Sequence, residues 1–503
     1  GINAFDVAFE AAGFRDAMDA RMLPEGADAE DIRYATMRWN VSDESGYGAI
    51  GPSVVDPRTG EIIDADILYE ANMILSWKRF YRANVDPVAA VNEMFEMSAD
   101  EAEMLANGGE MASLADEMAA QGTLLRTALM ARGELAPDSE VPDEYVYQAM
   151  KRVVMHELGH TLGLRHNFRS SADTPFDKLH DKAFTEENGL ASSVMEYPGI
   201  NIAPEGEAQG YYYSPSVGSY DKWVIAYGYT PDDARAEELA RQAAEPGHAY
   251  GPDEDARGYG ALDPDVSVYD LSSDPMKWGM QRTDLINGLF DDLPDYVLAD
   301  NVPYYSVTDA FSLLASQYGR AVSTGIKYIG GQYQYRDHYG DPNGRAPFVN
   351  VPKERQEDAL QFIIDAAFAA DAFELPADVY AKFGADRWSH WGNSNTYNGR
   401  IDYPLHEQLS GLQASLLSQV LSSARLSRIR DAEVKFGEEN VVTIPELFSG
   451  LTYAIWSEAW TAPGNNIPSL RRDLQRAHID AMTALITDAP GRTPADARSV
   501  ARH

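Results

Sequence analysis

Five residues in one short stretch have the types and spacing needed to hold a metal ion and activate water: His156, Glu157, His160, Gly163 and His166. His156 and His160 are four residues apart, so on a helix both imidazoles project from one face and can bind the same ion. Glu157 follows the first histidine, where its carboxylate can reach a water on the metal without itself being a ligand. Gly163 permits the backbone to leave the helix and turn back, which delivers His166 as a third nitrogen ligand. Three protein nitrogens leave one position of a zinc ion open to water, as in a catalytic rather than a structural site.

The alternative is a buried amphipathic helix whose histidines hydrogen-bond to backbone carbonyls. A bare HExxH pattern arises by chance in roughly one chain in a hundred of this length and composition. Requiring the glycine and the third histidine at their spacings lowers that frequency to about one in tens of thousands. The sequence therefore favours the zinc site.

A second stretch, SSVMEYP at residues 192–198, has the form of the methionine turn that underlies such zinc sites. HELGHTLGLRH followed by SVMEYP resembles the metzincin metallopeptidases, the clan of astacins, serralysins and matrixins. The resemblance implies that Met195 forms a floor beneath the three histidines without binding zinc. It also implies that Tyr197, two residues after the methionine as in astacins and serralysins, can bind the resting zinc and swing away to hydrogen-bond the oxyanion. The alternative for Tyr197 is a core tyrosine of the turn.

The elements that must position these residues can be predicted from the periodicity and the turn signals of the chain. We expect a helix at 2–14 that Gly13 ends, a strand at 34–41, a hairpin at 49–63, and the zinc helix starting at Pro142 and Asp143. Residues 66–68 are expected to lead into a helix that runs through Trp77 and Phe80. The predicted fold class is α+β. The protein is expected to comprise a metzincin-like catalytic domain, with a twisted mixed sheet and the zinc helix, and a mainly α-helical C-terminal region.

The stretches AFEAAGF, RYATMRW and AIGPSVVDPRTGEIIDADI resemble segments of the large bacterial secreted zinc-dependent metalloproteases that carry a long helical C-terminal extension. The expected division is a catalytic domain at 1–230, an acidic Gly/Pro/Asp-rich connecting region at 231–300 and a mainly helical domain at 301–503. A helical insertion is expected at about 70–140, including helices at 93–104 and 111–130. Metzincin sheets begin with a strand before the first helix, and this sequence starts at that helix. The missing strand could belong to an upstream segment of the same precursor that was cleaved off, or its absence could be a simple boundary effect.

Two further segments carry functional hypotheses. Residues 49–55 are a candidate for the strand beside the cleft that pairs with an extended peptide, although an interior strand is the alternative. The Asp-rich segment 244–275 could bind calcium through oxygen ligands, although no EF-hand pattern is present and a solvated loop is the alternative.

Composition excludes several classes of function and partner. The formal net charge of -38 argues against nucleic acid or an anionic membrane surface as a partner, since either would repel the protein. The 503 residues contain no cysteine, which excludes disulfides, thiol catalysis and cysteine-ligated zinc within them. No apolar run is long enough to cross a membrane. Together with the resemblance, these features predict a secreted protein, or a periplasmic or cell-surface protein of a bacterium.

The expected activity is hydrolysis of peptide bonds in a protein or peptide substrate, with Zn²⁺ as cofactor. Zinc lowers the pKa of its water from about 15.7 toward 7, and Glu157 then acts as the general base. Two alternatives stay open. One is a zinc hydrolase acting on something other than a protein. The other is an inactive, metzincin-like scaffold that binds partners through its helical C-terminal region.

Overall fold

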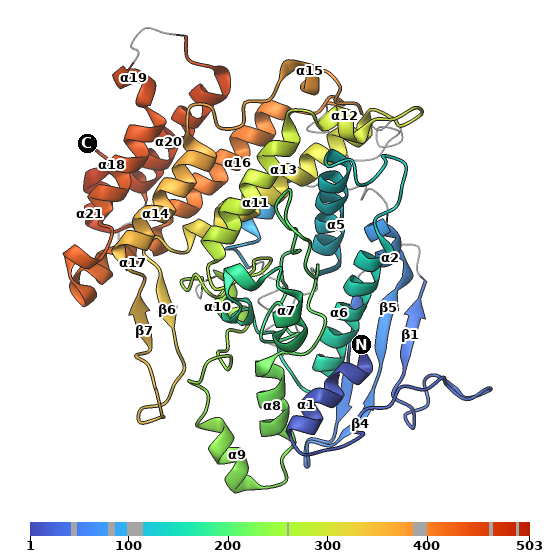
Figure 1. Ribbon diagram of the computed structural model, residues 1–503. Coiled ribbons are helices and arrows are strands. Elements are labelled where there is room, and N and C mark those ends of the chain that lie inside the picture. The colour runs from blue at the N-terminus through green and yellow to red at the C-terminus, as the bar shows by residue number, and fades with distance from the viewer. Residues whose placement is uncertain are drawn as a thin grey trace.

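The computed structural model describes residues 1–41, 48–78, 86–97, 114–258, 261–385, 400–461, 466–488 and 492–503. A small mixed sheet lies on one side of the molecule, and most of the remaining regular structure is helical (Figure 1). The predicted α+β class is therefore confirmed.

The three-stranded sheet has the order β1-β5-β2, formed by β1 (Met37–Asn40), β5 (Ile67–Glu70) and β2 (Ala49–Ile50). β5 runs parallel to β1 and antiparallel to β2, and Tyr69 of β5 is opposite both Trp39 and Ala49. The strand predicted at 34–41 is confirmed as β1. The candidate strand 49–55 is split: Ala49 and Ile50 form β2, which lies at an edge of this sheet within the described residues, and residues 53–55 form β3 of a separate hairpin.

The predicted hairpin is also present. β3 (Ser53–Val55) pairs antiparallel with β4 (Ile62–Ala65), and Gly60 has a φ of +77° in the turn between them. The sequence does not predict β5, because residues 66–68 have the pattern of a segment that leads into a helix. A short apolar run before a helix cannot be assigned to strand or helix by periodicity alone, and here pairing with β1 decides.

Residues 1–161 contribute six helices to the described structure. They are η1 (Ile2–Phe5), α1 (Asp6–Ala11), α2 (Ala71–Lys78), α3 (Pro87–Asn92), α5 (Leu114–Ala131) and α6 (Asp143–Thr161). The first predicted helix ends as expected, because Gly13 follows α1 with a φ of +96°. Residues 93–97 of the predicted helix 93–104 are not helical, and the rest of that segment lies outside the described residues, as does Phe80.

The middle of the chain consists of short helices joined by long irregular segments. They are η2 (Ser170–Asp173), η3 (Phe176–Lys178), α7 (Lys182–Asn188), α8 (Ser219–Tyr229), α9 (Asp233–Ala240), α10 (Asp253–Ala256), α11 (Pro275–Phe290) and α12 (Leu293–Val297). α8 and α9 lie at the lower end of the molecule, beyond the end of α6 that carries the histidines (Figure 1).

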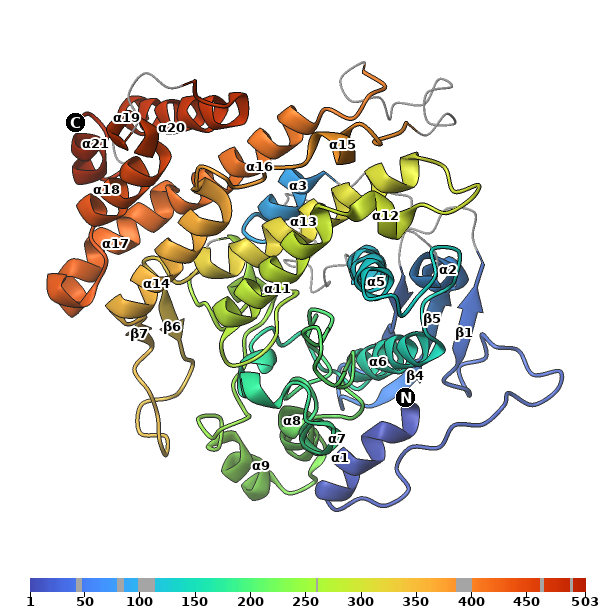
Figure 2. The ribbon, with the colours of Figure 1, turned by 45° about the horizontal axis from the view of Figure 1, so that its top comes forward.

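The C-terminal part is organised around α13 (Tyr305–Ile326), which is buried along nearly its whole length and packs against α3, α5, α11, α14 and α16 (Figure 2). One hairpin, formed by β6 (Gln332–Gln334) and β7 (Phe348–Asn350), interrupts the helices and extends from this region toward α9 (Figure 1). The remaining helices are α14 (Lys353–Ile363), η5 (Ile364–Phe368), α15 (Ala377–Tyr380), α16 (Leu405–Val420), α17 (Ser423–Phe436), η6 (Glu438–Asn440), α18 (Ile444–Ile455), α19 (Ser457–Thr461), α20 (Ser469–Thr487) and α21 (Ala495–Val500). None of the helices described here is both long and apolar enough to cross a membrane.

One continuous cluster of buried apolar side chains runs from Phe5 near the N-terminus to Ala497 near the C-terminus. The sheet, α6 and the C-terminal helices therefore share a hydrophobic core. The domain boundaries near residues 230 and 300 stay a prediction.

Candidate metal centre

α6 presents the first two histidines at its C-terminal end. It begins at Asp143, immediately after Pro142, as predicted. It ends at Thr161, and Gly163 follows with a φ of +91°, in the left-handed region that favours glycine. The chain then turns back and brings His166 beside the helix, which is the path that the spacing predicts.

The three histidine side chains converge. One nitrogen of each ring lies within 4.8 Å of the corresponding nitrogens of the other two. The ring centroids of His156 and His160 are 4.6 Å apart, and those of His166 lie 5.3 and 5.0 Å from them, respectively. Among the described residues this is the group of potential metal-binding side chains that lies close enough together to hold one ion.

The hydrogen bonds of His156 and His160 fix which ring nitrogen carries a proton. Nδ1 of His156 lies 2.8 Å from the carbonyl oxygen of Val194, and Nδ1 of His160 lies 3.0 Å from that of Leu164. Because a carbonyl oxygen only accepts, each Nδ1 must donate, which leaves a lone pair on each Nε2 of the neutral rings. These two Nε2 atoms are 3.1 Å apart. Two lone pairs at that distance repel each other unless a cation lies between them.

His166 follows the same pattern with a different acceptor. Its Nδ1 lies 2.9 Å from Oδ1 of Asp253, and both side chains are fully buried. All three Nδ1 atoms thus face oxygen acceptors, and the Nε2 atoms remain for a metal. The set fits zinc, which binds neutral imidazole nitrogen well and for which the chain offers no thiolate.

Burial favours the neutral form that a metal ligand requires. Desolvation, with smaller contributions from the neighbouring His160, Arg152 and His166, lowers the pKa of His156 well below its usual value. His156 is therefore neutral at physiological pH.

Met195 lies in the turn beneath α6 and is fully buried. Gly159 of α6 faces it so closely that a Cβ on residue 159 would overlap the Met195 sulfur. The backbone of the turn is tied to the zinc motif, because the N–H of Asn167 donates to the Met195 carbonyl at 3.1 Å. Arg152 of α6 donates to the Glu196 carbonyl at 2.6 Å. The turn and the metal-binding helix therefore form one rigid unit.

Asp221 of α8 holds the same turn, although no pattern in the sequence predicts this role. Its carboxylate accepts hydrogen bonds from the Ser193 hydroxyl at 2.7 Å and from the N–H groups of Val194 and Gly218, both at 2.9 Å. Burial raises the pKa of Asp221 to about 6. Because the Val194 carbonyl accepts from His156, the aspartate fixes that ring through one intervening residue.

Tyr197 is buried against the histidines. Its ring centroid lies 4.6 Å from that of His166 and 5.2 Å from that of His156, and the Phe168 ring is 5.3 Å away. The side chain therefore belongs to the wall of the metal centre. These ring contacts are compatible both with a core tyrosine and with one that reaches the reacting atoms.

Glu157 lies on the part of α6 that packs against the end of β2. Gly51, directly after β2, approaches it so closely that a Cβ there would overlap the Glu157 carbonyl oxygen. Burial, with a smaller contribution from Glu157, raises the pKa of Tyr69 well above its usual value, so that tyrosine stays neutral beside the carboxylate. The edge strand β2 therefore ends against the residue that the sequence predicts as the general base.

The Asp-rich segment 244–275 is largely buried, so its interpretation as a solvated loop is wrong. Asp253, Asp263 and Asp270 are fully buried. Arg169, itself buried, forms an ion pair with Asp263. This pair compensates the charge of the carboxylate, which is no longer solvated by water. Calcium binding by this segment stays a prediction.

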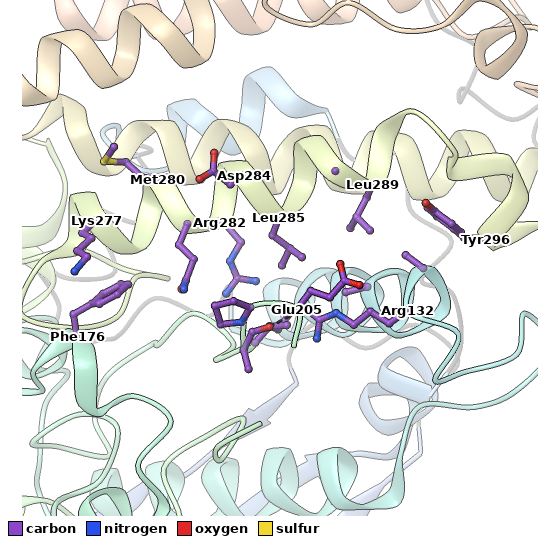
Figure 3. A pocket seen from close by; sticks show the side chains of 17 residues that line it. Arg132, Phe176, Glu205, Lys277, Met280, Arg282, Asp284, Leu285, Leu289 and Tyr296 are labelled. Atoms are coloured by element: carbon purple, nitrogen blue, oxygen red, sulfur yellow. Dashed lines mark hydrogen bonds between the residues drawn. The ribbon is translucent and has the colours of Figure 1, made fainter. Parts of the chain in front are cut away.

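A separate pocket of about 640 Å³ lies between α5 and α11 (Figure 3). Leu285 and Leu289 of α11 line it together with small apolar residues of α5, and Arg282 extends from α11 toward the segment 202–205. Arg282 donates to the carbonyl of Ile200. None of the three histidines, the general-base candidate or the turn tyrosine lines this pocket, so it lies outside the metal centre.

Comparison with known families gives one match. A family model described as Met-zincin matches residues 138–462, which is well over half of the chain. The matched part runs from just before α6 into the C-terminal helices and includes the three histidines, Glu157, the methionine turn and Asp253. No curated protein and no solved structure matches the chain.

Proposed function

The chain belongs to the Met-zincin family, and from that membership we propose that it is a zinc-dependent endopeptidase. The observation that carries the proposal is the convergence of three imidazoles whose Nδ1 atoms all face oxygen acceptors. Such a set would hold zinc through its Nε2 atoms and leave one position open.

A zinc ion held there would supply Lewis acidity, acidifying a water and polarising the scissile carbonyl. The proton transfers of the reaction are carried out by a residue of the chain. Glu157 accepts the proton of the water whose oxygen attacks the carbonyl carbon, and it passes that proton to the amine nitrogen as the C–N bond breaks. The position of Glu157 next to His156 on α6 supports this role.

The edge strand β2 supports a peptide as the substrate. An extended peptide can add to the edge of a sheet through backbone hydrogen bonds, and β2, an edge strand among the described residues, ends beside Glu157. A substrate that pairs with an edge strand is an extended chain, which favours an endopeptidase over a hydrolase of small molecules.

The direct test is digestion of a peptide library by metal-free protein before and after one equivalent of zinc is added. We expect cleavage of internal bonds only in the zinc-loaded sample. Zinc binding without cleavage of any peptide would favour a hydrolase with another substrate. Failure to bind zinc would favour the scaffold alternative.

We propose that Tyr197 donates a hydrogen bond to the developing oxyanion. Its ring contacts with His166 and His156 place it in the wall of the centre. Tyr197→Phe keeps those ring contacts and removes the hydroxyl. Loss of one oxyanion donor lowers kcat by about 10²–10³-fold, with little effect on KM. Steady-state kinetics on one fluorogenic peptide measures this, and an unchanged kcat would leave Tyr197 as a core residue of the turn.

The protein is further proposed to act outside the cytoplasm of a bacterium. The net charge of -38 and the absence of cysteine support this location. Fractionation of cells that make the protein would test it, and recovery in the cytoplasm alone would contradict it.

A further inference from the structure

We propose that Asp253 is a positioning residue of the metal centre, whose carboxylate fixes the orientation of His166 and raises the affinity of the site for zinc. This inference rests on the proposed function, since it concerns the same three histidines. The contact that carries it is the 2.9 Å distance between His166 Nδ1 and Asp253 Oδ1, with both side chains fully buried.

The acceptor of His166 differs from those of the other two histidines in its charge. His156 and His160 each donate to a neutral backbone carbonyl, whereas His166 donates to a carboxylate. A carboxylate behind an imidazole makes the far nitrogen a better donor to a metal and holds the ring in one tautomer. His166 also needs this restraint most, because it lies beyond the end of α6 and has no helix to orient it.

The backbone that carries Asp253 is fixed by Asn167, the residue after the third histidine. The Asn167 side chain donates to the carbonyl of Ala249 at 3.0 Å and accepts from the N–H of Gly251 at 3.0 Å. The N–H of Phe168 donates to the Gly251 carbonyl at 2.7 Å. Asn167 and Phe168, which directly follow His166, therefore hold the segment that supplies the carboxylate acceptor of His166.

Residues of the C-terminal region also contact α10 and the segment that follows it. Arg336, which follows β6, forms a paired contact with the carboxylate of Asp255. Lys327, at the end of α13, is buried and donates to the carbonyls of Ala256 at 2.7 Å and Val266 at 2.6 Å. In the view of Figure 1, α10 lies between α7 and the β6–β7 hairpin. The orientation of the third histidine therefore depends on the helical region as well as on the zinc motif.

The test compares Asp253→Asn and Asp253→Ala with wild type in the full chain. Asparagine keeps the shape and an acceptor oxygen but removes the charge, while alanine removes both. Substitution of such partners weakens metal binding by about 10–100-fold. We expect about 10-fold weaker zinc binding for asparagine and about 100-fold for alanine. Competition of the apoprotein with a chromogenic chelator, well below the unfolding temperature, measures the dissociation constant.

The matched control is Glu254→Gln, in the same short helix. Glu254 contacts Arg165 at 3.0 Å, and both side chains are about half exposed. An exposed ion pair contributes little to the stability of the fold. Zinc affinity of this control should therefore stay within about twofold of wild type. Should the alanine variant fail to fold, the asparagine variant decides, because it preserves packing.

Zinc affinity of Asp253→Asn and Asp253→Ala within about twofold of wild type would overturn the role of Asp253. A lower melting temperature of the apoprotein with unchanged zinc affinity would do the same, because it would show a purely structural role. These outcomes leave the proposed function standing. Conversely, a wild type that binds zinc with the expected order of variants but cleaves no peptide would contradict the endopeptidase proposal and leave Asp253 as a positioning residue.

Discussion

Glu157→Gln is expected to leave zinc bound and to lower kcat/KM for peptide cleavage by about 10²–10⁴-fold, the contribution typical of a general acid–base group. That range corresponds to roughly 3–5 kcal/mol of transition-state stabilisation. Glutamine keeps the size of the side chain beside His156 but cannot accept the proton of the attacking water. Zinc content by elemental analysis and kinetics on a fluorogenic peptide measure the two halves of this prediction.

The control for this variant is Glu144→Gln. Glu144 is an exposed residue in the first turn of the same helix, twelve residues before His156. Its loss should leave kcat/KM within about threefold of wild type, as expected for a surface position. A Glu157→Gln protein that cleaved peptides at the wild-type rate would show that another group acts as the base.

His166→Ala is expected to abolish stoichiometric zinc binding and, with it, activity. Removal of a group that only contacts a ligand weakens metal binding by about 10–100-fold, so removal of the ligand itself should cost more than about 100-fold. His156 and His160 remain on α6, and two imidazoles without the third leave the ion weakly held. Zinc content after dialysis and the zinc concentration needed for half-maximal activity measure the effect.

His338→Ala is the matched control for the loss of a histidine. His338 is exposed in the loop between β6 and β7, and it is not part of the metal-binding group among the described residues. The control should retain one zinc and full activity. A His166→Ala protein that retained one zinc through dialysis and cleaved peptides normally would remove His166 from the ligand set.

The sequence predicts those parts of the centre that depend on local geometry. The spacing of His156 and His160 fixes their common face on a helix, and the left-handed Gly163 fixes the turn that follows. The helix at the N-terminus, the strand β1 and the β3–β4 hairpin also follow from local periodicity and turn residues.

The partners of the histidines could not be predicted in this way. Asp253 is 87 residues from His166, and no residue spacing relates the two. Its neighbourhood, rich in Gly, Pro and Asp, has the composition of a solvated loop, yet tertiary contacts with Asn167 and Lys327 bury it. The only signal available was the number of acidic residues there, which suggests calcium as readily as a histidine partner.

Asp221 illustrates the same limit. In the sequence it is one acidic residue near the start of a helix, and a capping role explains it fully. Only the fold brings its carboxylate to Ser193 and Val194. Long-range pairing likewise decides that residues 67–70 form strand β5.

The most direct test of the account is anomalous diffraction at the zinc edge from crystals of the zinc-loaded protein. We predict a single strong peak at about 2.0–2.1 Å from the Nε2 atoms of His156, His160 and His166, the distance typical of zinc–imidazole bonds. A zinc-containing crystal with His166 turned away from the other two rings, or with its peak at another place, would contradict the central claim.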